Sequence, residues 1–173
     1  SDIDAVKLAN KKGIDVIITD HHEPHEELPP AFAIVDHKQK DCEYPEKILC
    51  GSGVGYKLIQ AILKLKRFDL KEGHEKWLLD MVGLATLSDM VPLTGENRAL
   101  AHFGIRVLKM SPRKGLMRLL NHLKINQKYL TEDDISFMIT PRINAASRMG
   151  VPMDAFRLLA TDNDHEAHEY VQH

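Results

Sequence analysis

The chain has 173 residues, a formal net charge of −2 and two cysteines, Cys42 and Cys50. This length allows one domain with its own core. The balanced charge excludes a wholly basic nucleic-acid-binding surface, although a local cationic track would still suit an enzyme that acts on nucleic acid. Two cysteines are too few for a disulfide framework and lack metal-pair spacing, which favours a reduced, cytoplasmic setting. No apolar run reaches membrane-spanning length, so we expect no membrane association.

The first 50 residues have an α/β pattern. Apolar spacing predicts a helix over 2–12, capped by Asp2 and ended by Gly13. Short apolar runs predict buried strands over 14–18 and 31–35. A polar, turn-rich stretch follows up to Cys50. This order of elements is typical of a parallel α/β sheet.

The rest of the chain is predicted to be helical. Apolar residues recur at helical spacing over 54–65, 77–87, 99–108, 116–123, 135–139 and 156–160. Two strands do not make a stable buried parallel sheet. The expected fold class is therefore α/β: the C-terminal part of a larger parallel-sheet domain, followed by a mostly helical half. We also expect the unpaired sheet edge to promote association between copies.

Asp20, His21 and His22 directly follow the first predicted strand. Ligands of open α/β sheets gather at the carboxyl ends of strands. One carboxylate and two imidazoles at this place suit a metal or phosphate site. A polar strand end that faces water explains the same residues, and the segment alone does not decide between the two.

Three further segments carry polar groups at helix boundaries. An apolar helix runs into Asp89, which is interpreted either as a cap or as a cation ligand, and Pro92 stops the helix. Arg142 and Arg148 lie among small and polar residues, where they either bind phosphate or are solvated. The glycine-rich stretch 51–55 opens a helix; it could bind an anion, but close packing against the sheet is the favoured interpretation.

Taken together, these segments resemble the DHH phosphoesterase family, and within it the exonucleases specific for single-stranded DNA. The similarity runs through residues 13–24 (GIDVIITDHHEP), 41–45 (DCEYP), 50–58 (CGSGVGYKL), 88–93 (SDMVPL) and 141–149 (PRINAASRM). Asp-His-His alone also occurs in pyrophosphatases and small-nucleotide phosphatases. The Pro-Arg-Ile-Asn-Ala-Ala run is more particular to the exonucleases.

The resemblance implies a two-metal phosphodiesterase that uses Mn²⁺ or Mg²⁺ and degrades single-stranded DNA in the 5′-to-3′ direction in DNA repair and recombination. It makes His21 and Asp89 metal ligands, and it places His22 on a metal or on the scissile phosphate. Asp20 would hold an imidazole in place, so that Asp20, His21 and His22 are the expected catalytic residues. Paired metals of this kind activate water and stabilise the attacking and leaving oxygens.

The resemblance also implies contacts with the substrate and with partners. Arg142, Asn144 and Arg148 would contact the DNA backbone on the helical side of the cleft. A single-strand-binding protein is a candidate partner. The expected division is a DHH phosphoesterase portion over 1–110 and a helical extension over 111–173.

The sequence departs from the family pattern in several places. Neither the Asp-x-Asp of the first motif nor the Asp of the second has a counterpart, because the Asp2–Asp4 stretch precedes a helix instead of ending a strand. The family's DHH-associated nucleic-acid-binding domain also has no counterpart. Ser147 stands in place of a glycine, and Glu46 stands where an aromatic residue is common. We therefore expect weak or absent metal binding and no exonuclease activity from these 173 residues alone.

Two competing interpretations come from different classes. One is a DHH phosphoesterase that acts on short oligonucleotides or small nucleotides; residues 140–150 argue against it. The other is a non-catalytic helical interaction module with a decayed site. The intact Asp20-His21-His22 segment and Asp89 argue against decay.

Overall fold

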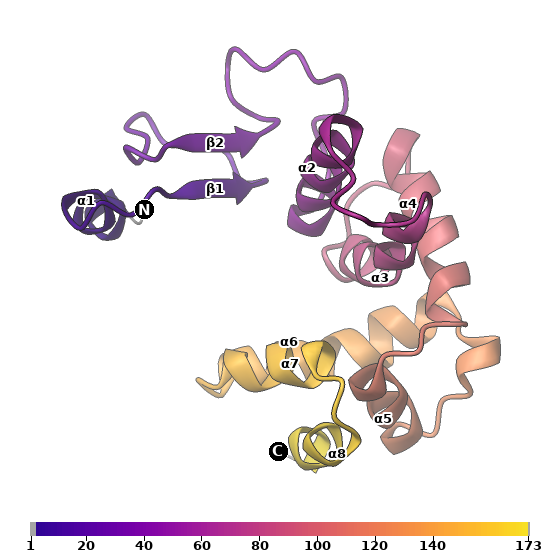
Figure 1. Ribbon diagram of the computed structural model, residues 1–173. Helices are drawn as coiled ribbons and strands as arrows, with labels where there is room; N and C mark the ends of the chain where they lie inside the picture. Colours follow the sequence, from indigo (N-terminus) through magenta and orange to yellow (C-terminus); the bar gives the residue numbers. More distant parts are fainter. Residues whose placement is uncertain (1–2, 173) are drawn as a thin grey trace.

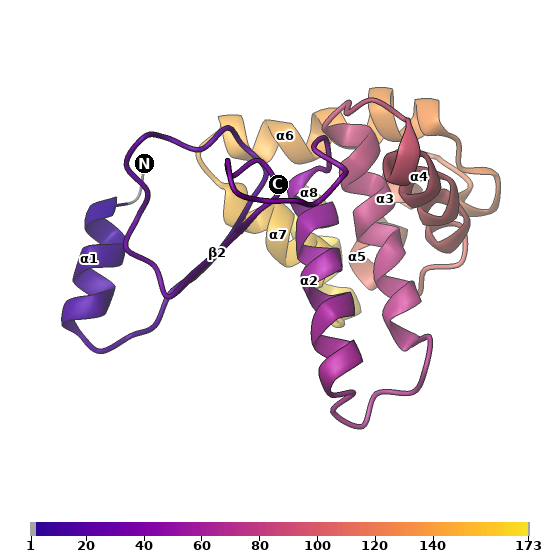
Figure 2. The ribbon, with the colours of Figure 1, turned by 90° about the horizontal axis from the view of Figure 1, so that it is seen from above.

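The computed structural model of the chain describes residues 3–172, apart from the side chain of Ser147. The elements are α1 (Ile3–Lys11), β1 (Ile17–Asp20), β2 (Ala33–Asp36), α2 (Gly51–Leu65), the 3₁₀ helix η1 (His74–Leu78), α3 (Leu79–Ser88), α4 (Gly95–Leu108), α5 (Lys114–His122), the 3₁₀ helix η2 (Gln127–Tyr129), the π-helix η3 (Asp134–Ile139), α6 (Thr140–Arg148), α7 (Pro152–Ala160) and α8 (Asp164–Gln172). Figure 1 shows α1 and the strands on one side of α2–α4, with α5–α8 packed below these helices; Figure 2 gives the view from above. Within the described part of the chain, no helix is long and apolar enough to cross a bilayer.

β1 and β2 form a parallel pair in which Asp20 lies opposite Asp36. The predicted strand over 14–18 is therefore misplaced, and β2 also begins two residues later than predicted. The cause is pairing: the ladder to β2 defines the strand, and the apolar residues before it lie outside the ladder. Asp20 is thus the last residue of β1, and the two strands end side by side on carboxylates.

Helix α1 agrees with its prediction. Val6 is its buried residue, and Gly13 takes a φ of 71°, a left-handed conformation that ends the helix readily because glycine has no Cβ. The predicted capping residue, Asp2, lies outside the described residues.

Helix α3 is the centre of the helical part. Its buried residues lie all around it, because α2, α4 and η3 pack on different sides. Gly83 and Gly104 let α3 and α4 approach closely: a Cβ on Gly83 would lie 2.5 Å from the Cα of Gly104. A cluster of buried side chains extends from Leu84 to Ala167 and crosses the boundary predicted at residue 110. The domain division itself stays a prediction.

Helices α2, α4, α5 and α7 begin earlier than their apolar spacing indicates, whereas α3 begins two residues later than predicted. The apolar spacing of α2 begins at residue 54, but the helix begins at Gly51, in the glycine-rich stretch predicted to open it; α4 begins at Gly95 instead of residue 99. The segment predicted as a short helix over 135–139 is a π-helix that continues directly into α6. First turns rich in glycine and polar residues carry little apolar signal, which explains the late predicted starts.

The loop between β2 and α2 is anchored on α4. The Tyr44 hydroxyl donates to Glu96 Oε2 (2.5 Å), and the Lys57 ammonium donates to Glu96 Oε1 (2.8 Å). Glu46 Oε2 accepts from the backbone N–H of Glu96 in the first turn of α4 (3.3 Å). Glu46, which departs from the family pattern, thus satisfies an otherwise free helix N–H.

Candidate active site

His21 and Asp89 come together although they are far apart in the sequence. His21 directly follows β1, and Asp89 directly follows α3. His21 Nδ1 lies 3.5 Å from Asp89 Oδ2. The His21 side chain is 22% exposed and that of Asp89 is 43% exposed, so both remain accessible to an ion from solution. The two residues predicted as metal ligands therefore lie within reach of one cation.

Gly51 at the start of α2 packs against the His21 ring. A Cβ on Gly51 would lie 3.2 Å from His21 Cδ2, which is tighter than ordinary contact. The absence of a side chain at Gly51 therefore leaves space for the imidazole. The glycine-rich stretch was expected to pack against the sheet, and the structure places its first glycine against the histidine that follows β1.

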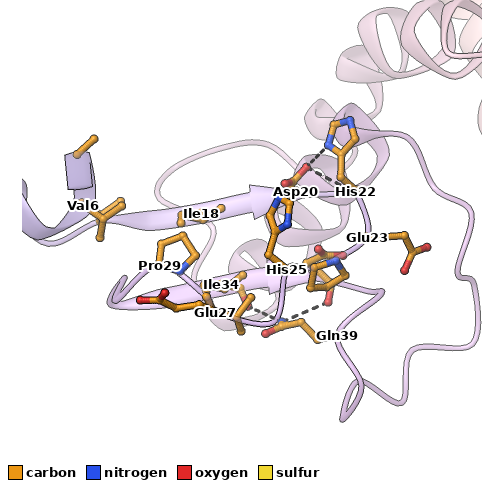
Figure 3. A pocket seen from close by; sticks show the side chains of 15 residues that line it. Val6, Ile18, Asp20, His22, Glu23, His25, Glu27, Pro29, Ile34 and Gln39 are labelled. Atoms are coloured by element: carbon orange, nitrogen blue, oxygen red, sulfur yellow. Dashed lines mark hydrogen bonds and ion pairs between the residues drawn. The ribbon is translucent and has the colours of Figure 1, made fainter. Parts of the chain in front are cut away.

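Asp20 organises the turn after β1. Its Oδ1 accepts from the backbone N–H of His21 (2.7 Å) and of His22 (3.3 Å), and it lies 2.7 Å from His22 Nδ1 (Figure 3). Partial burial alone would raise the pKa of the Asp20 carboxyl, but the hydrogen bonds from the His22 ring and from both N–H groups lower it below its ordinary value. Asp20 therefore contacts the His22 ring where the predicted orienting role requires it, and the role itself stays a prediction.

The Asp20-His21-His22 segment has the donors of a metal site. One candidate ligand atom from each residue lies within 4.8 Å of the other two. The two imidazole rings lie 4.2 Å apart at their centroids, tilted by 49°. Mn²⁺ accepts both imidazole and carboxylate ligands, so this donor set, with Asp89 beside His21, fits the expected cation.

A cavity of about 590 Å³ opens on the sheet face beside the Asp20-His22 pair. Figure 3 shows Asp20 and His22 at one end of it, with Glu23 and His25 from the following loop and Ile18 and Ile34 from the sheet. The ionisable side chains that line it are all carboxylates and imidazoles. This side of the site suits a cation better than a phosphate.

A second cavity, of about 540 Å³, lies between the end of α3 and the η3–α6 segment. Asn144 and Arg148 both line it, since residues four apart lie on one side of a helix. Ser88, which precedes Asp89, lines it too. Met90 and Phe137 add apolar surface and are 85% and 70% exposed. We call this space the α3–α6 cavity.

Arg142 lies elsewhere. It lines a cavity of about 270 Å³ next to α5, α7 and α8. The structure does not bring it together with Asn144 and Arg148, because a separation of six residues places Arg142 on another side of α6 than Arg148. Its contact with substrate stays a prediction.

Comparison with known proteins agrees with this geometry. Residues 1–86 match the family model described as "DHH family, N-terminal domain". Nearly the whole chain also aligns with single-stranded-DNA-specific exonucleases named RecJ. The chain belongs to the DHH family. The recognition made from the sequence is confirmed.

The relatives are much longer than the chain. It is 40% identical to RecJ of Bacillus subtilis over 94% of its length but 20% of the relative's. For RecJ of Escherichia coli the identity is 37%, over 94% of the chain and 30% of the relative. The chain therefore spans about a fifth to a third of the length of these curated relatives.

Solved structures show the same fold. The chain is similar to RecJ of Thermus thermophilus in complex with Mn²⁺, with a TM-score of 0.80 and 32% identity over 99% of this chain and 25% of that one. A manganese-bound exonuclease RecJ gives a TM-score of 0.82 and 32% identity, over 98% and 42% of the two chains. The expected fold class, a small parallel sheet followed by helices, is confirmed.

Several residues beside the candidate site were not predicted from the sequence. Nothing in the sequence pairs Ser88 with Thr140, whose hydroxyls lie 2.6 Å apart. Met90 takes a φ of 55°, which is unusual for a residue other than glycine, and turns the chain sharply after Asp89. Phe137 was counted only as part of a short apolar helix. Its place four residues before the Pro-Arg-Ile-Asn run was the one available signal.

Proposed function

We propose that the chain belongs to a Mn²⁺- or Mg²⁺-dependent exonuclease that degrades single-stranded DNA from its 5′ end in DNA repair and recombination. The observation that carries the proposal is the contact between His21 and Asp89, immediately beside the cavity that Asn144 and Arg148 line. This arrangement joins cation ligands and phosphate-binding groups in one place. The names of the relatives are consistent with it.

The residues around the turn after β1 would share the chemistry. His21 and Asp89 would hold the metal, which supplies Lewis-acid stabilisation and lowers the pKa of water when bound. Asp20 occupies Nδ1 of His22, so Nε2 is the ring atom left to contact the metal or the scissile phosphate. The low pKa of Asp20 keeps it ionised as the acceptor in this pair.

The α3–α6 cavity would take the DNA strand. Arg148 offers a guanidinium for backbone phosphate, and the Asn144 amide adds donors and an acceptor. Exposed Met90 and Phe137 offer apolar surface to bases, which are accessible in a single strand but are stacked and paired in a duplex. Arg142 would be a further backbone contact from another side of α6.

The main alternative is a DHH phosphoesterase that acts on short oligonucleotides or small nucleotides. A small nucleotide needs little contact beyond its phosphate and one base. The α3–α6 cavity instead combines Arg148, Asn144 and two exposed apolar side chains, which favours a longer strand. Rates measured on DNA of increasing length would separate the two, since the alternative requires a rate that falls with length.

A non-catalytic helical module is less consistent with the paired His21 and Asp89.

A single-strand-binding protein as a partner and a cytoplasmic location complete the proposal, and both rest on the sequence.

The test measures Mn²⁺-dependent digestion of 5′-phosphorylated single-stranded DNA by the full-length gene product. His21→Ala and Asp89→Ala should each lower the rate by about 100-fold or more, because a metal ligand is lost. His165→Ala and Asp162→Ala, which remove exposed residues near the C-terminus, are the matched controls. Full activity in Asp89→Ala would overturn the proposal.

A further inference from the structure

A hydrogen bond between two hydroxyls joins the metal side of the candidate site to its DNA side. Ser88 Oγ lies 2.6 Å from Thr140 Oγ1. Ser88 is the last residue of α3 and directly precedes Asp89. Thr140 is the first residue of α6, which carries Asn144 and Arg148.

The surroundings of this bond make it a defined junction. Thr140 is 8% exposed and follows the π-helix η3, whose Ile135 and Ile139 are fully buried in the core. A π-helix is rare, and it shifts the side chains that follow it relative to an ordinary helix. On the opposite side, Asp89 ends α3 and Met90 reverses the chain with its left-handed φ.

Burial alone does not require the two hydroxyls to pair. Serine and threonine within helices readily donate to the carbonyl one turn earlier, as Thr86 does to Val82 O (2.7 Å). Ser88 and Thr140 are 52 residues apart in the sequence, and their hydroxyls bond to each other between the end of α3 and the start of α6. The bond therefore links the end of α3 to the start of α6 at the point where both enter the site, in addition to the core packing between α3 and η3.

We propose that Ser88 and Thr140 are positioning residues, which hold Asp89 in register with Asn144 and Arg148. This inference rests on the proposed function. It means that the DNA held by α6 is presented to the metal ligands at a distance that the hydroxyl pair defines. Neither hydroxyl touches the reacting atoms. Both side chains line the α3–α6 cavity, but their hydroxyls bond to each other and carry no charge for the DNA backbone. Their loss should therefore lower the rate of cleavage and leave the affinity for DNA nearly unchanged.

The experiment compares Ser88→Ala, Thr140→Val and the double variant in the full-length gene product. A displacement of about 1 Å near reacting groups costs up to about 100-fold in rate, so we expect kcat on single-stranded DNA to fall roughly tenfold. KM should stay unchanged, as should oligonucleotide affinity measured by fluorescence anisotropy in EDTA. The double variant should be no worse than either single variant, since each removes the same bond.

Two control variants separate positioning from stability. Thr140→Ser keeps the hydroxyl and should keep kcat. Thr161→Val removes a hydroxyl that donates to Glu166 on α8, far from the site in sequence, and should also keep kcat. Thermal unfolding of every variant monitors the fold.

The outcomes are distinct. An unchanged kcat in both single variants, a loss of DNA affinity that matches the loss of rate, or additive losses in the double variant would each overturn the inference. If Thr140→Val fails to fold, Ser88→Ala decides the matter. A wild-type protein that does not cleave single-stranded DNA would instead refute the proposed function, and the inference would fall with it.

Discussion

The two regions that form the candidate site differ in how deeply their apolar side chains are buried. In the α1–β2 region, residues 3–36, Ile17 and Phe32 are 59% and 73% exposed. In the helical region, residues 51–172, Leu116 and Ile135 are completely buried within one continuous cluster. His21 comes from the first region and Asp89 from the second. The geometry of the two predicted metal ligands therefore depends on a few contacts between a lightly packed region and a densely packed one.

Those contacts are specific. Gly51 makes room for the His21 ring at the start of α2. Tyr44 and Glu46 attach the loop after β2 to the first turn of α4 through Glu96. Fold stability should accordingly come from the helical region, while the site should be sensitive to small changes at the junction.

The largest expected difference is between core truncations in the two regions. Leu120→Ala removes a side chain that is 1% exposed and should lower the free energy of unfolding by about 3 kcal/mol. Ile17→Ala, at a strand residue that is 59% exposed, should lower the free energy of unfolding by less than about 1 kcal/mol. Urea denaturation of both variants measures this. Equal costs would show that the sheet contributes to the core as much as the helices do.

A buried carboxylate should give the next largest effect. Asp80 accepts from Arg113 Nε and from Ser111 Oγ, both at 2.7 Å, and ties α3 to the start of α5. Arg113→Ala removes the cationic partner of this carboxylate. It should lower the free energy of unfolding by about 2 kcal/mol. Arg157→Ala, which breaks the partly exposed pair with Asp154, should lower the free energy of unfolding by about 0.5 kcal/mol or less in the same assay. A loss in Arg113→Ala no larger than in Arg157→Ala would contradict this ranking.

A pair of glycine variants tests the junction directly. Gly55→Ala places a Cβ with nothing within 4 Å and should stabilise α2 by about 0.5–1 kcal/mol. In the full-length gene product, Gly51→Ala should push the His21 ring aside by a few tenths of an ångström and weaken Mn²⁺ binding about tenfold. Thermal melting and Mn²⁺ titration followed by electron paramagnetic resonance separate the two effects. Unchanged Mn²⁺ affinity in Gly51→Ala would show that the contact does not matter for the ligands.

The smallest effect should be a dependence on pH at Glu96. Burial alone would raise the pKa of this carboxyl, but hydrogen bonds from Lys57 and Tyr44 lower it below its usual 4.5. Its contribution to stability is therefore complete above about pH 4.5 and is lost as the pH falls through the lower value of the folded state. Glu96→Gln should reduce the loss of stability in acid by about 1 kcal/mol or less. The effect is small because the Lys57–Glu96 pair is partly exposed. Identical acid profiles of variant and wild type would contradict this.

The sequence predicted the elements better than their ends. The helical spacing of apolar residues located α2, α3, α4, α5 and α7, because the buried face of a helix repeats along the chain, but it predicted no helix over 140–148, where α6 lies. It did not locate the start of α4 at Gly95, which depends on Glu46 accepting from the first turn 50 residues away. It also could not indicate that the segment before Thr140 widens into a π-helix. Strand limits were displaced for a similar reason, since the partner strand defines them.

For the site, the sequence by itself determined which residues are predicted to carry the chemistry. Asp20, His21, His22 and Asp89 were identified from local pattern and family resemblance, since residue type and motif are properties of a short segment. Only the tertiary structure decided their arrangement: His21 against Asp89, Asn144 with Arg148, Arg142 in a different cavity, and Ser88 bonded to Thr140. Distances between residues many positions apart depend on how whole elements pack, and no local pattern encodes them.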